Sequence, residues 1–306
     1  MSENLEHMQA MANTVNLVQN SKHPTNKVAT SVYGSNFKSE SFTSAHTNTC
    51  PHEIQEIIKI KGRIRERSGY IHAELNALMG CKPGWQSLAL TVTDPPCPNC
   101  MKNIVDAGVT SVFIDAKGFK KDFYQRRRFE FDLISKRIAK FAGISLYVLN
   151  RKKNEIHPIL LDQEISEVAV DQERWELFPD NLNQQELLKK KGLQKSVTAY
   201  VQDSSSKRYL ACSSETLPGN MSQEEADALL SDSRLSKRYN FKNFPILSII
   251  LLSLRKGFLL DKEILHLNFE PSSLDLVYII AFGIEKISLS SGQEMTRAEI
   301  LRILSS

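Results

Sequence analysis

The chain has 306 residues, of which 41% are hydrophobic and 24% charged, and its formal net charge is +4. This length suits about two domains, and so small a charge does not require a nucleic-acid partner. The most apolar window, residues 245–254, is shorter than the about 20 residues of a membrane span, and residues 1–7 lack the features of a signal peptide. The sequence therefore predicts no membrane partner, and five cysteines, an odd and scattered set, predict a reduced, cytoplasmic protein.

The first quarter of the chain predicts one helix and two strands. Residues 5–19 carry apolar side chains at helical spacing, and a polar loop over 20–26 follows. Residues 27–33 and 39–45 are strand candidates joined by a turn over 34–38. We expect a basic loop after them, with cations at Lys59, Lys61, Arg63, Arg65 and Arg67. That density suits a phosphate or a polyanion, although a solvated basic helix face is the commoner explanation.

Two motifs then bring together the residue types of a metal site. Residues 70–78 read Tyr-Ile-His-Ala-Glu-Leu-Asn-Ala-Leu and contain His72 and Glu74. Residues 94–101 read Asp-Pro-Pro-Cys-Pro-Asn-Cys-Met and contain Cys97 and Cys100. Two thiolates and one imidazole are a three-ligand set for Zn2+ that leaves the fourth position to water. A carboxylate two residues from the histidine can reach that water without being a ligand. This is the H-x-E…P-C-x-x-C signature of the zinc nucleobase deaminases.

The stretch between and after these motifs predicts the surrounding elements. A short helix over 74–79, a loop over 80–86 and a buried strand over 87–93 lead to the second motif. Pro98 is placed to open a helix over 99–107 that stops at Gly108. Both helix starts that bear ligands are therefore expected side by side under one sheet. Three other interpretations of these residues stay open: a structural zinc knuckle, a Cys-x-x-Cys redox pair, and a core histidine beside two buried thiols.

Strands over 111–115 and 145–149, with a helix over 123–142 between them, complete the first half. A second group of cations lies here and suits either a phosphate or a solvated helix face: Lys117, Lys120, Lys121, Arg126, Arg127 and Arg128. Helices that alternate with strands predict an α/β fold in which helices cover both faces of a mixed sheet.

Through the two motifs, residues 5–150 resemble the cytidine deaminase superfamily. The wording His-Ala-Glu-Leu-Asn-Ala, followed by Pro-Cys-x-x-Cys, looks most like the deoxycytidylate deaminase branch. The resemblance implies a three-layer α/β/α sandwich with Zn2+ held by His72, Cys97 and Cys100. It also implies hydrolytic deamination of a cytosine nucleotide, above all dCMP to dUMP, by attack of zinc hydroxide with Glu74 moving the protons. A pyrimidine nucleotide as the small-molecule partner and a homo-oligomeric state are further implications.

The same resemblance names three substrate contacts: Asn48, Ala73 and Pro96. Deoxycytidylate deaminases place the asparagine of a Tyr-Asn-Gly-x-Pro run at the sugar, and residues 46–51 here read His-Thr-Asn-Thr-Cys-Pro. Asn48 fits the asparagine, but the tyrosine and the glycine are replaced, and a plain turn residue is an equal alternative. Ala73 is expected to contact the base through its backbone. His46 is either a substrate contact or a histidine at the end of a strand.

The second half resembles a repeat of the first at an offset of 175 residues. Residues 93–100 fall on 268–275 and residues 106–112 on 281–287 with matching Pro, Gly and apolar positions. Under this offset the metal and proton-transfer residues are replaced by Leu247, Ile249, Ser272 and Asp275, which cannot build a soft-ligand site. We therefore expect a catalytic domain over 1–150, a linker over 151–182, and a catalytically inactive deaminase-like domain over 183–306. The inactive domain is either a structural partner or an allosteric or substrate-guiding surface.

Two other functions compete with deamination of a free nucleotide. The basic clusters and the inactive domain would also suit a deaminase that acts on single-stranded DNA or RNA, or on tRNA. Few aromatic residues flank the motifs, however, and stacking platforms for bases need them. The third possibility is a non-catalytic regulatory protein that keeps zinc only for structure, in which Glu74 would have no purpose.

Overall fold

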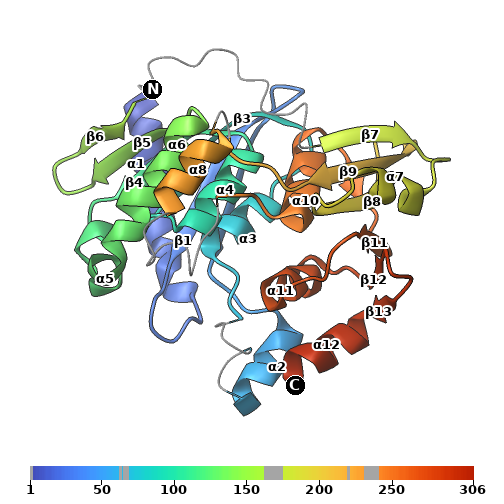
Figure 1. Ribbon diagram of the computed structural model, residues 1–306. Helices are drawn as coiled ribbons and strands as arrows, with labels where there is room; N and C mark the ends of the chain where they lie inside the picture. The colour runs from blue at the N-terminus through green and yellow to red at the C-terminus, as the bar shows by residue number, and fades with distance from the viewer. Residues whose placement is uncertain (1–2, 62–63, 65–68, 162–174, 219–220, 231–240) are drawn as a thin grey trace. The chain divides into compact units, whose positions relative to one another are not determined.

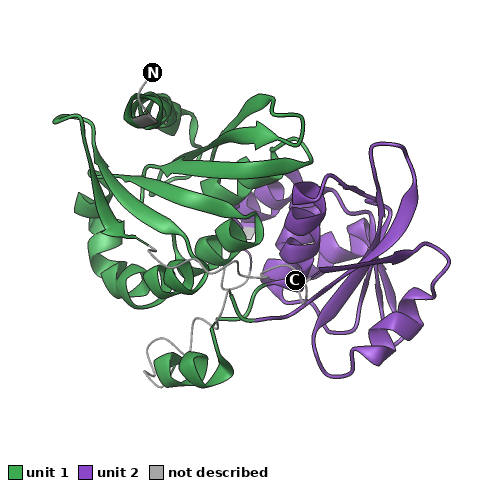
Figure 2. Cartoon of the chain, turned by 90° about the horizontal axis from the view of Figure 1, so that it is seen from above, with its two compact units in different colours: residues 1–48, 72–170, 217–243 green, residues 49–71, 171–216, 244–306 purple. Residues whose placement is uncertain are grey.

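A computed structural model describes residues 3–61, 64, 69–161, 175–218, 221–230 and 241–306 (Figure 1). The chain divides into two compact units (Figure 2), and neither is a continuous segment. Unit 1 comprises Met1–Asn48, His72–Val170 and Leu217–Asn243, and unit 2 comprises Thr49–Ile71, Asp171–Thr216 and Phe244–Ser306. Within the described ranges, every helix is too short or too polar to cross a membrane.

Unit 1 is built on a six-stranded mixed sheet in the order β2-β1-β3-β4-β5-β6. β1 pairs antiparallel with β2 and β3, β3 to β5 run parallel, and β6 returns antiparallel to β5. The strands are β1 Ala29–Asn36, β2 Ser41–Thr47, β3 Trp85–Val92, β4 Val109–Asp115, β5 Ser145–Asn150 and β6 Glu155–Leu160. The α/β class with a mixed sheet, expected from the sequence, is confirmed.

Helices cover both faces of this sheet (Figures 1 and 2). α1 (Glu3–Leu17) packs on one face, where its Met11 joins Phe113 and Leu149 in a buried cluster. Neighbours of Phe113 in β4 point to the opposite face because side chains alternate along a strand, and Val112 is fully buried there. That second face carries the remaining helices of the first half of the chain: α3 Ala73–Met79, α4 Pro98–Asp106, α5 Asp122–Glu130 and α6 Lys136–Phe141. The short turns η1 Val18–Asn20 and η2 Gly118–Lys120 and the helix α8 Gln223–Leu230 complete unit 1.

Two sequence predictions in the first half are wrong in their local detail. The predicted continuous helix over 123–142 is interrupted by a π-helical turn, η3 (Phe131–Ser135), and by non-helical backbone at Arg127. The predicted basic loop contains α2 (His52–Lys61), which belongs to unit 2. Isoleucines at 54, 57 and 58 form the i, i+3, i+4 stripe of a helix, and the run of cations obscured it. Arg63, Arg65 and Arg67 lie outside the described residues.

Unit 2 has a mixed sheet in the order β13-β12-β11-β8-β9-β7, with β10 paired to β8. β8 is antiparallel to β9 and β11, β11 and β12 are parallel, and β13 is antiparallel to β12. The strands are β7 Trp175–Pro179, β8 Ser196–Gln202, β9 Arg208–Ser214, β10 Leu259–Leu260, β11 Ile264–Leu267, β12 Lys286–Leu289 and β13 Glu294–Thr296. The helices besides α2 are α7 Gln184–Lys190, α10 Pro245–Arg255, α11 Ser273–Phe282 and α12 Arg297–Ser305.

One residue correspondence of the predicted repeat changes with the helix boundaries. The offset of 175 pairs Cys97 with Ser272, and both are the N-cap residues of their helices. The same offset pairs His72 with Leu247, but α10 begins three residues earlier than the offset requires. By helix position, the N-cap residue His72 therefore corresponds to Phe244. Phenylalanine is no more a metal ligand than leucine, so this correction adds no ligand to unit 2.

Two strands lie within residues 151–182, the segment that the sequence predicts as a linker. β6 is the edge strand of the sheet of unit 1, and β7 is the edge strand of the sheet of unit 2. Two further segments each follow a strand of one unit in the chain but belong to the other unit. Thr49–Ile71 follows β2 of unit 1 and is part of unit 2, where Arg297 binds Glu53 at 2.7 Å. Leu217–Asn243 follows β9 of unit 2 and is part of unit 1, where the Lys102 ammonium donates to the carbonyl of Lys242 at 2.8 Å.

Candidate metal centre

The three predicted metal ligands lie at the beginnings of α3 and α4. His72 is the N-cap residue of α3, and its extended backbone directs the ring away from the helix. Asn76 ties this helix to β2 by donating from Nδ2 to the carbonyl of Thr47 at 2.9 Å. Cys97 is the N-cap residue of α4, and Pro98 occupies the first helical position, where its fixed φ favours helix initiation. Cys100 follows one turn later and faces the same side as Cys97.

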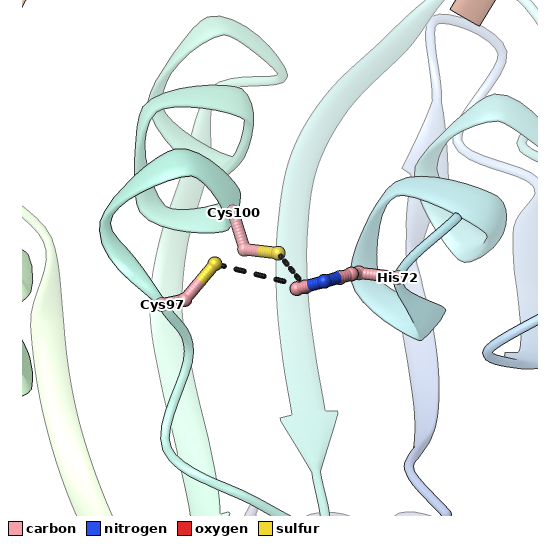
Figure 3. A group of neighbouring side chains, drawn as sticks. All are labelled: His72, Cys97 and Cys100. Atoms are coloured by element: carbon pink, nitrogen blue, oxygen red, sulfur yellow. Dashed lines mark hydrogen bonds between the residues drawn. The ribbon is translucent and has the colours of Figure 1, made fainter. Parts of the chain in front are cut away.

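The side chains of His72, Cys97 and Cys100 point toward one another (Figure 3). His72 Nδ1 lies 3.2 Å from Cys100 Sγ and 3.6 Å from Cys97 Sγ, and all three ligand atoms lie within 4.8 Å of one another. Zinc bonds of about 2.3 Å to sulfur and about 2.05 Å to nitrogen at tetrahedral angles place N and S about 3.6 Å apart. The donor set and its spacing therefore fit Zn2+. Among the described residues, His72, Cys97 and Cys100 are the one group of three or more histidine, cysteine or acidic side chains close enough together to hold a metal ion.

The two thiols are electrostatically unlike the other cysteines. A hydrogen bond from the Cys100 thiol, and the positive charge of His72, hold the pKa of Cys97 well below its usual range although burial opposes them. The same hydrogen bond and burial raise the pKa of Cys100. By contrast, burial raises the pKa of Cys81 to about 12 and that of Cys212 to about 11. The lowered pKa of Cys97 favours its thiolate form, which is the form that binds zinc.

His72 completes this charge distribution. The residue as a whole is exposed, but its Nδ1 faces the two sulfurs. Desolvation lowers the pKa of its imidazole, and the thiolate of Cys97 outweighs that effect and raises the pKa to about 9. Zinc must displace this proton, because only neutral imidazole binds a metal, so metal binding and proton release are coupled.

Glu74 is buried two residues from His72, in the first turn of α3, with 4% of its surface exposed. Burial raises the pKa of its carboxyl to about 7, against the opposing effects of the His72 charge and a hydrogen bond from Cys100. A carboxyl group with a pKa near 7 can both accept and release a proton at neutral pH, as a general acid and base must.

The loop that leads to Cys97 is fixed by residues that the sequence motifs do not contain. Asp94 forms an ion pair with Lys121, which also donates to the carbonyl of Lys27 at 3.3 Å. Ser135, at the end of the π-helical turn, donates to the carbonyl of Pro96 at 2.9 Å. Gly118 approaches the same loop so closely that a Cβ atom there would lie 2.3 Å from the carbonyl oxygen of Thr93. No sequence signal marks these contacts, since they join segments more than 20 residues apart.

The three predicted substrate contacts occupy different surroundings. Ala73 is fully buried between His72 and Glu74, and Pro96 is buried directly before Cys97. Asn48 is 5% exposed, and its side-chain amide is engaged with the loop over 20–28. Its Oδ1 accepts from Ser21 Oγ at 2.6 Å and Val28 N at 3.0 Å, and its Nδ2 donates to Asn26 O at 2.8 Å. These bonds give Asn48 the loop-holding role of a turn residue, and its contact with a sugar stays a prediction.

His23, which the sequence analysis did not name, and Arg127, a member of the predicted basic cluster, both interact electrostatically with His72. His23 lies in the loop that Asn48 holds, and its Nδ1 accepts from the backbone N–H groups of residues 25 and 26 at 3.3 and 3.0 Å. Burial and the positive charge of His72 lower the pKa of His23. The positive charge of Arg127 acts to lower the pKa of His72. His46, in contrast, lies beside Gly80 at the opposite end of α3 from His72, which favours the interpretation as a strand-end histidine.

Comparison with known proteins gives matches among solved structures. No known family profile and no curated sequence matches the chain. Two structures of a dCMP deaminase from the cyanophage S-TIM5 are similar to part of it, one in apo form and one in complex with dCMP and dUMP. Each is 20% identical, has a TM-score of 0.31 and covers 48% of this chain, with 99% of the first structure and 98% of the second covered. The geometry of the metal centre, rather than this likeness, carries the function proposed below.

Proposed function

We propose that the chain is a zinc-dependent hydrolytic deaminase of cytosine nucleotides and that its main reaction converts dCMP to dUMP. The observation that carries the proposal is the buried carboxyl group of Glu74 beside a three-ligand group with zinc spacing. A structural zinc site takes four protein ligands, whereas a catalytic site takes three and keeps a position open. A redox pair of cysteines would have no use for His72 at 3.2 Å or for an adjacent carboxyl group with a raised pKa.

The residues of the centre have separate tasks in this reaction. His72, Cys97 and Cys100 would hold Zn2+, which when bound supplies an activated water as the nucleophile. Glu74 would accept the two protons of that water in turn and pass one to the ring nitrogen and the other to the amine that leaves as ammonia, while the water oxygen takes the place of the amine on the ring carbon. Burial serves this cycle, because it brings the pKa of Glu74 to about 7 and so balances proton uptake against release. The fixed position of Ala73 between His72 and Glu74 supports a backbone contact with the reacting edge of the base.

The first test is ammonia release from a panel of substrates by the zinc-loaded protein. The panel comprises dCMP, CMP, deoxycytidine, cytidine and a short single strand that contains cytosine, with Glu74→Gln as the control. We expect turnover of dCMP in the wild type and a loss of at least about 1,000-fold in the variant, with an unchanged zinc content. Turnover of the strand alone would replace the proposal by a nucleic-acid deaminase. Bound zinc without turnover of any substrate would favour a regulatory protein.

We also propose that residues 183–306 are an inactive copy of the catalytic domain over 1–150. In support, the strand order β9-β8-β11-β12 repeats β2-β1-β3-β4, with the same parallel and antiparallel pairings. The cysteine pair is replaced at the same helix position by Ser272 and Asp275, which form a capping box. A structural partner fits these replacements better than an allosteric site. The homo-oligomer and the cytoplasmic location stay predictions, and light scattering of the purified protein tests the first.

A further inference from the structure

We infer that the outer edge of β2 is an interaction surface at which two copies of this chain join their sheets. The two β2 strands would pair antiparallel around a twofold axis, so that the sheet of unit 1 continues into that of the second copy. This contact is independent of the proposed reaction, and it would give the predicted homo-oligomer a defined interface. Three features of β2 support it: an unprotected edge, the direction of its backbone groups, and side chains that complement those of a second copy.

β2 is the least protected of the four edge strands of the two described sheets. Edge strands invite pairing with another chain, and proteins usually block them with proline, with charged side chains or by keeping the strand short. β6 carries Glu155 and Pro158, β7 carries Glu176 and Pro179, and β13 has only three residues, one of them Glu294. β2 has seven residues and contains neither proline nor an acidic residue, lysine or arginine. Its ladder with β1 also continues through seven residue pairs without a bulge.

The hydrogen bonds at the ends of the β1–β2 ladder show which backbone groups of β2 point outward. Just beyond the ladder, Asn48 N donates to Val28 O at 3.1 Å, and Asn36 N donates to Glu40 O at 3.0 Å. Hydrogen-bonded and non-hydrogen-bonded pairs alternate along an antiparallel ladder. The even-numbered residues of β2 therefore bond to β1, and the N–H and C=O groups of the odd-numbered residues point away from it. Among the described residues, no strand pairs with this outer side of β2.

The outward backbone groups belong to residues that a second strand can reach. Ser41, Thr43 and Ala45 are all exposed, and their side chains are small. Thr47, the last odd-numbered residue of the strand, is buried, and its carbonyl accepts from Asn76 Nδ2 at 2.9 Å. The accessible stretch is therefore centred on Thr43. A twofold axis at this residue would place Thr43 of both copies opposite each other, and Ser41 of each copy opposite Ala45 of the other.

The side chains of β2 also match a second copy in this register. Positions equally far from Thr43 on either side lie opposite each other, so Phe42 of one copy would face Ser44 of the other. In the same way, Glu40 would face His46, and both of these residues are exposed. A carboxylate would thus meet an imidazole twice, once on each side of the axis, and no like charges would lie opposite each other. Cross-strand pairs of this kind stabilise a sheet, whereas like charges destabilise it.

Two measurements on the full chain test this contact. Sedimentation velocity at protein concentrations of about 1–200 µM gives the dissociation constant of a dimer, and residue-resolved amide hydrogen exchange locates the contact. Thr43→Pro removes the outward N–H without removing a hydrogen bond to β1, and Thr43→Lys keeps that N–H but places two like charges opposite each other. Thr43→Val is the control that keeps the N–H and adds no charge. His157→Lys is the matched charge control, at an exposed position of the opposite edge strand, β6.

A contact through one short strand is small, so we expect a wild-type dissociation constant of about 10–100 µM. Thr43→Pro and Thr43→Lys should each weaken dimerisation by at least about 10-fold, and both controls by less than about threefold. As the protein concentration rises, the N–H groups of Ser41, Thr43 and Ala45 should become protected from exchange. Those of Phe42 and Ser44 should be protected at every concentration, because they bond to β1. A wild type that is still monomeric at about 200 µM, a dimer that Thr43→Pro and Thr43→Lys leave unchanged, or a dimer without this alternating protection would overturn the inference.

Discussion

Gly118 offers a test of how the metal centre is positioned from outside the motifs. The substitution Gly118→Ala adds one methyl group where the η2 turn meets the end of β3. That methyl carbon would lie 2.3 Å from the carbonyl oxygen of Thr93 and 2.9 Å from the Cα atom of Asp94. Both contacts are with backbone, so no side chain can rotate away to make room. The neighbouring hydrogen bonds of Thr93 with Ala29, each of 3.1 Å, resist the movement from the other side.

The expected magnitude follows from that distance. The contact with Thr93 must open from 2.3 Å to at least 3.0 Å, a shift of about 0.7 Å. Overpacking of this kind typically lowers the free energy of unfolding by about 1–3 kcal/mol. Cys97 follows Thr93 by only four residues, and zinc–ligand distances tolerate deviations of about 0.2 Å. We therefore expect Gly118→Ala to weaken zinc binding by about 10-fold or more, as loss of a supporting contact does in other zinc sites.

Competition with a chromophoric chelator measures the zinc dissociation constant, and urea unfolding of the metal-free protein measures stability. Gly292→Ala is the control, because Gly292 has φ +89° and open space around it, so the change strains only its own backbone. That variant should lose about 1 kcal/mol of stability and keep its zinc affinity. If Gly118→Ala lowers stability but binds zinc as tightly as the wild type, the η2 contact does not position Cys97 and the reasoning fails.

Two more outcomes concern unit 2. The hydrogen bond from Arg297 lowers the pKa of Glu53. A carboxyl group whose pKa is lowered by folding stabilises the folded state at pH values above its unfolded-state pKa of about 4.3. That stabilisation is lost as the pH falls through the folded-state pKa, so Arg297→Met should flatten the acid side of the stability profile. The free energy of unfolding of the two proteins should differ by less than about 1 kcal/mol, because both side chains are partly exposed. Urea unfolding at several pH values from about 3 to 7 tests this, and the same pH dependence in the wild type and the variant would contradict it. Ser272→Ala removes the N-cap of α11 and should cost about 1 kcal/mol without changing the zinc content, whereas lost zinc would refute the separation of these sites.

The sequence predicts those parts of the molecule that depend on local pattern. Five strands of the first sheet, β1 to β5, the start of α4 at Pro98 and the grouping of His72, Cys97 and Cys100 follow from periodicity, turn residues and motif spacing. The ligand group is predictable because the H-x-E…P-C-x-x-C motif identifies its members by residue type and spacing.

The remaining features depend on contacts between distant segments. The closeness of Gly118 to Thr93 and the engagement of Asn48 with the 20–28 loop arise only from tertiary packing. The π-helical turn η3 has no composition signal, since its residues also suit an α-helix. Membership of Thr49–Ile71 in unit 2 is decided by α2 and its pairing with Arg297, 244 residues away from Glu53. Pattern reasoning covers a window of residues, and none of these partners lies within one.

The beginnings of α4 and α11 show one backbone geometry used for two purposes. Cys97 has φ −70° and ψ 164°, and Ser272 has φ −72° and ψ 166°. Ser272 accepts from the N–H of Asp275, whereas the side chain of Cys97 makes no capping bond and faces His72 at 3.6 Å. An effective N-cap contributes about 1 kcal/mol, which a metal ligand at this position forgoes. Structural zinc sites release about 10–16 kcal/mol on binding, so a metal-bearing helix start tolerates that loss. A helix start without a metal ligand has no such compensation, and at the start of α11 the Ser272–Asp275 capping box satisfies the helix N-terminus.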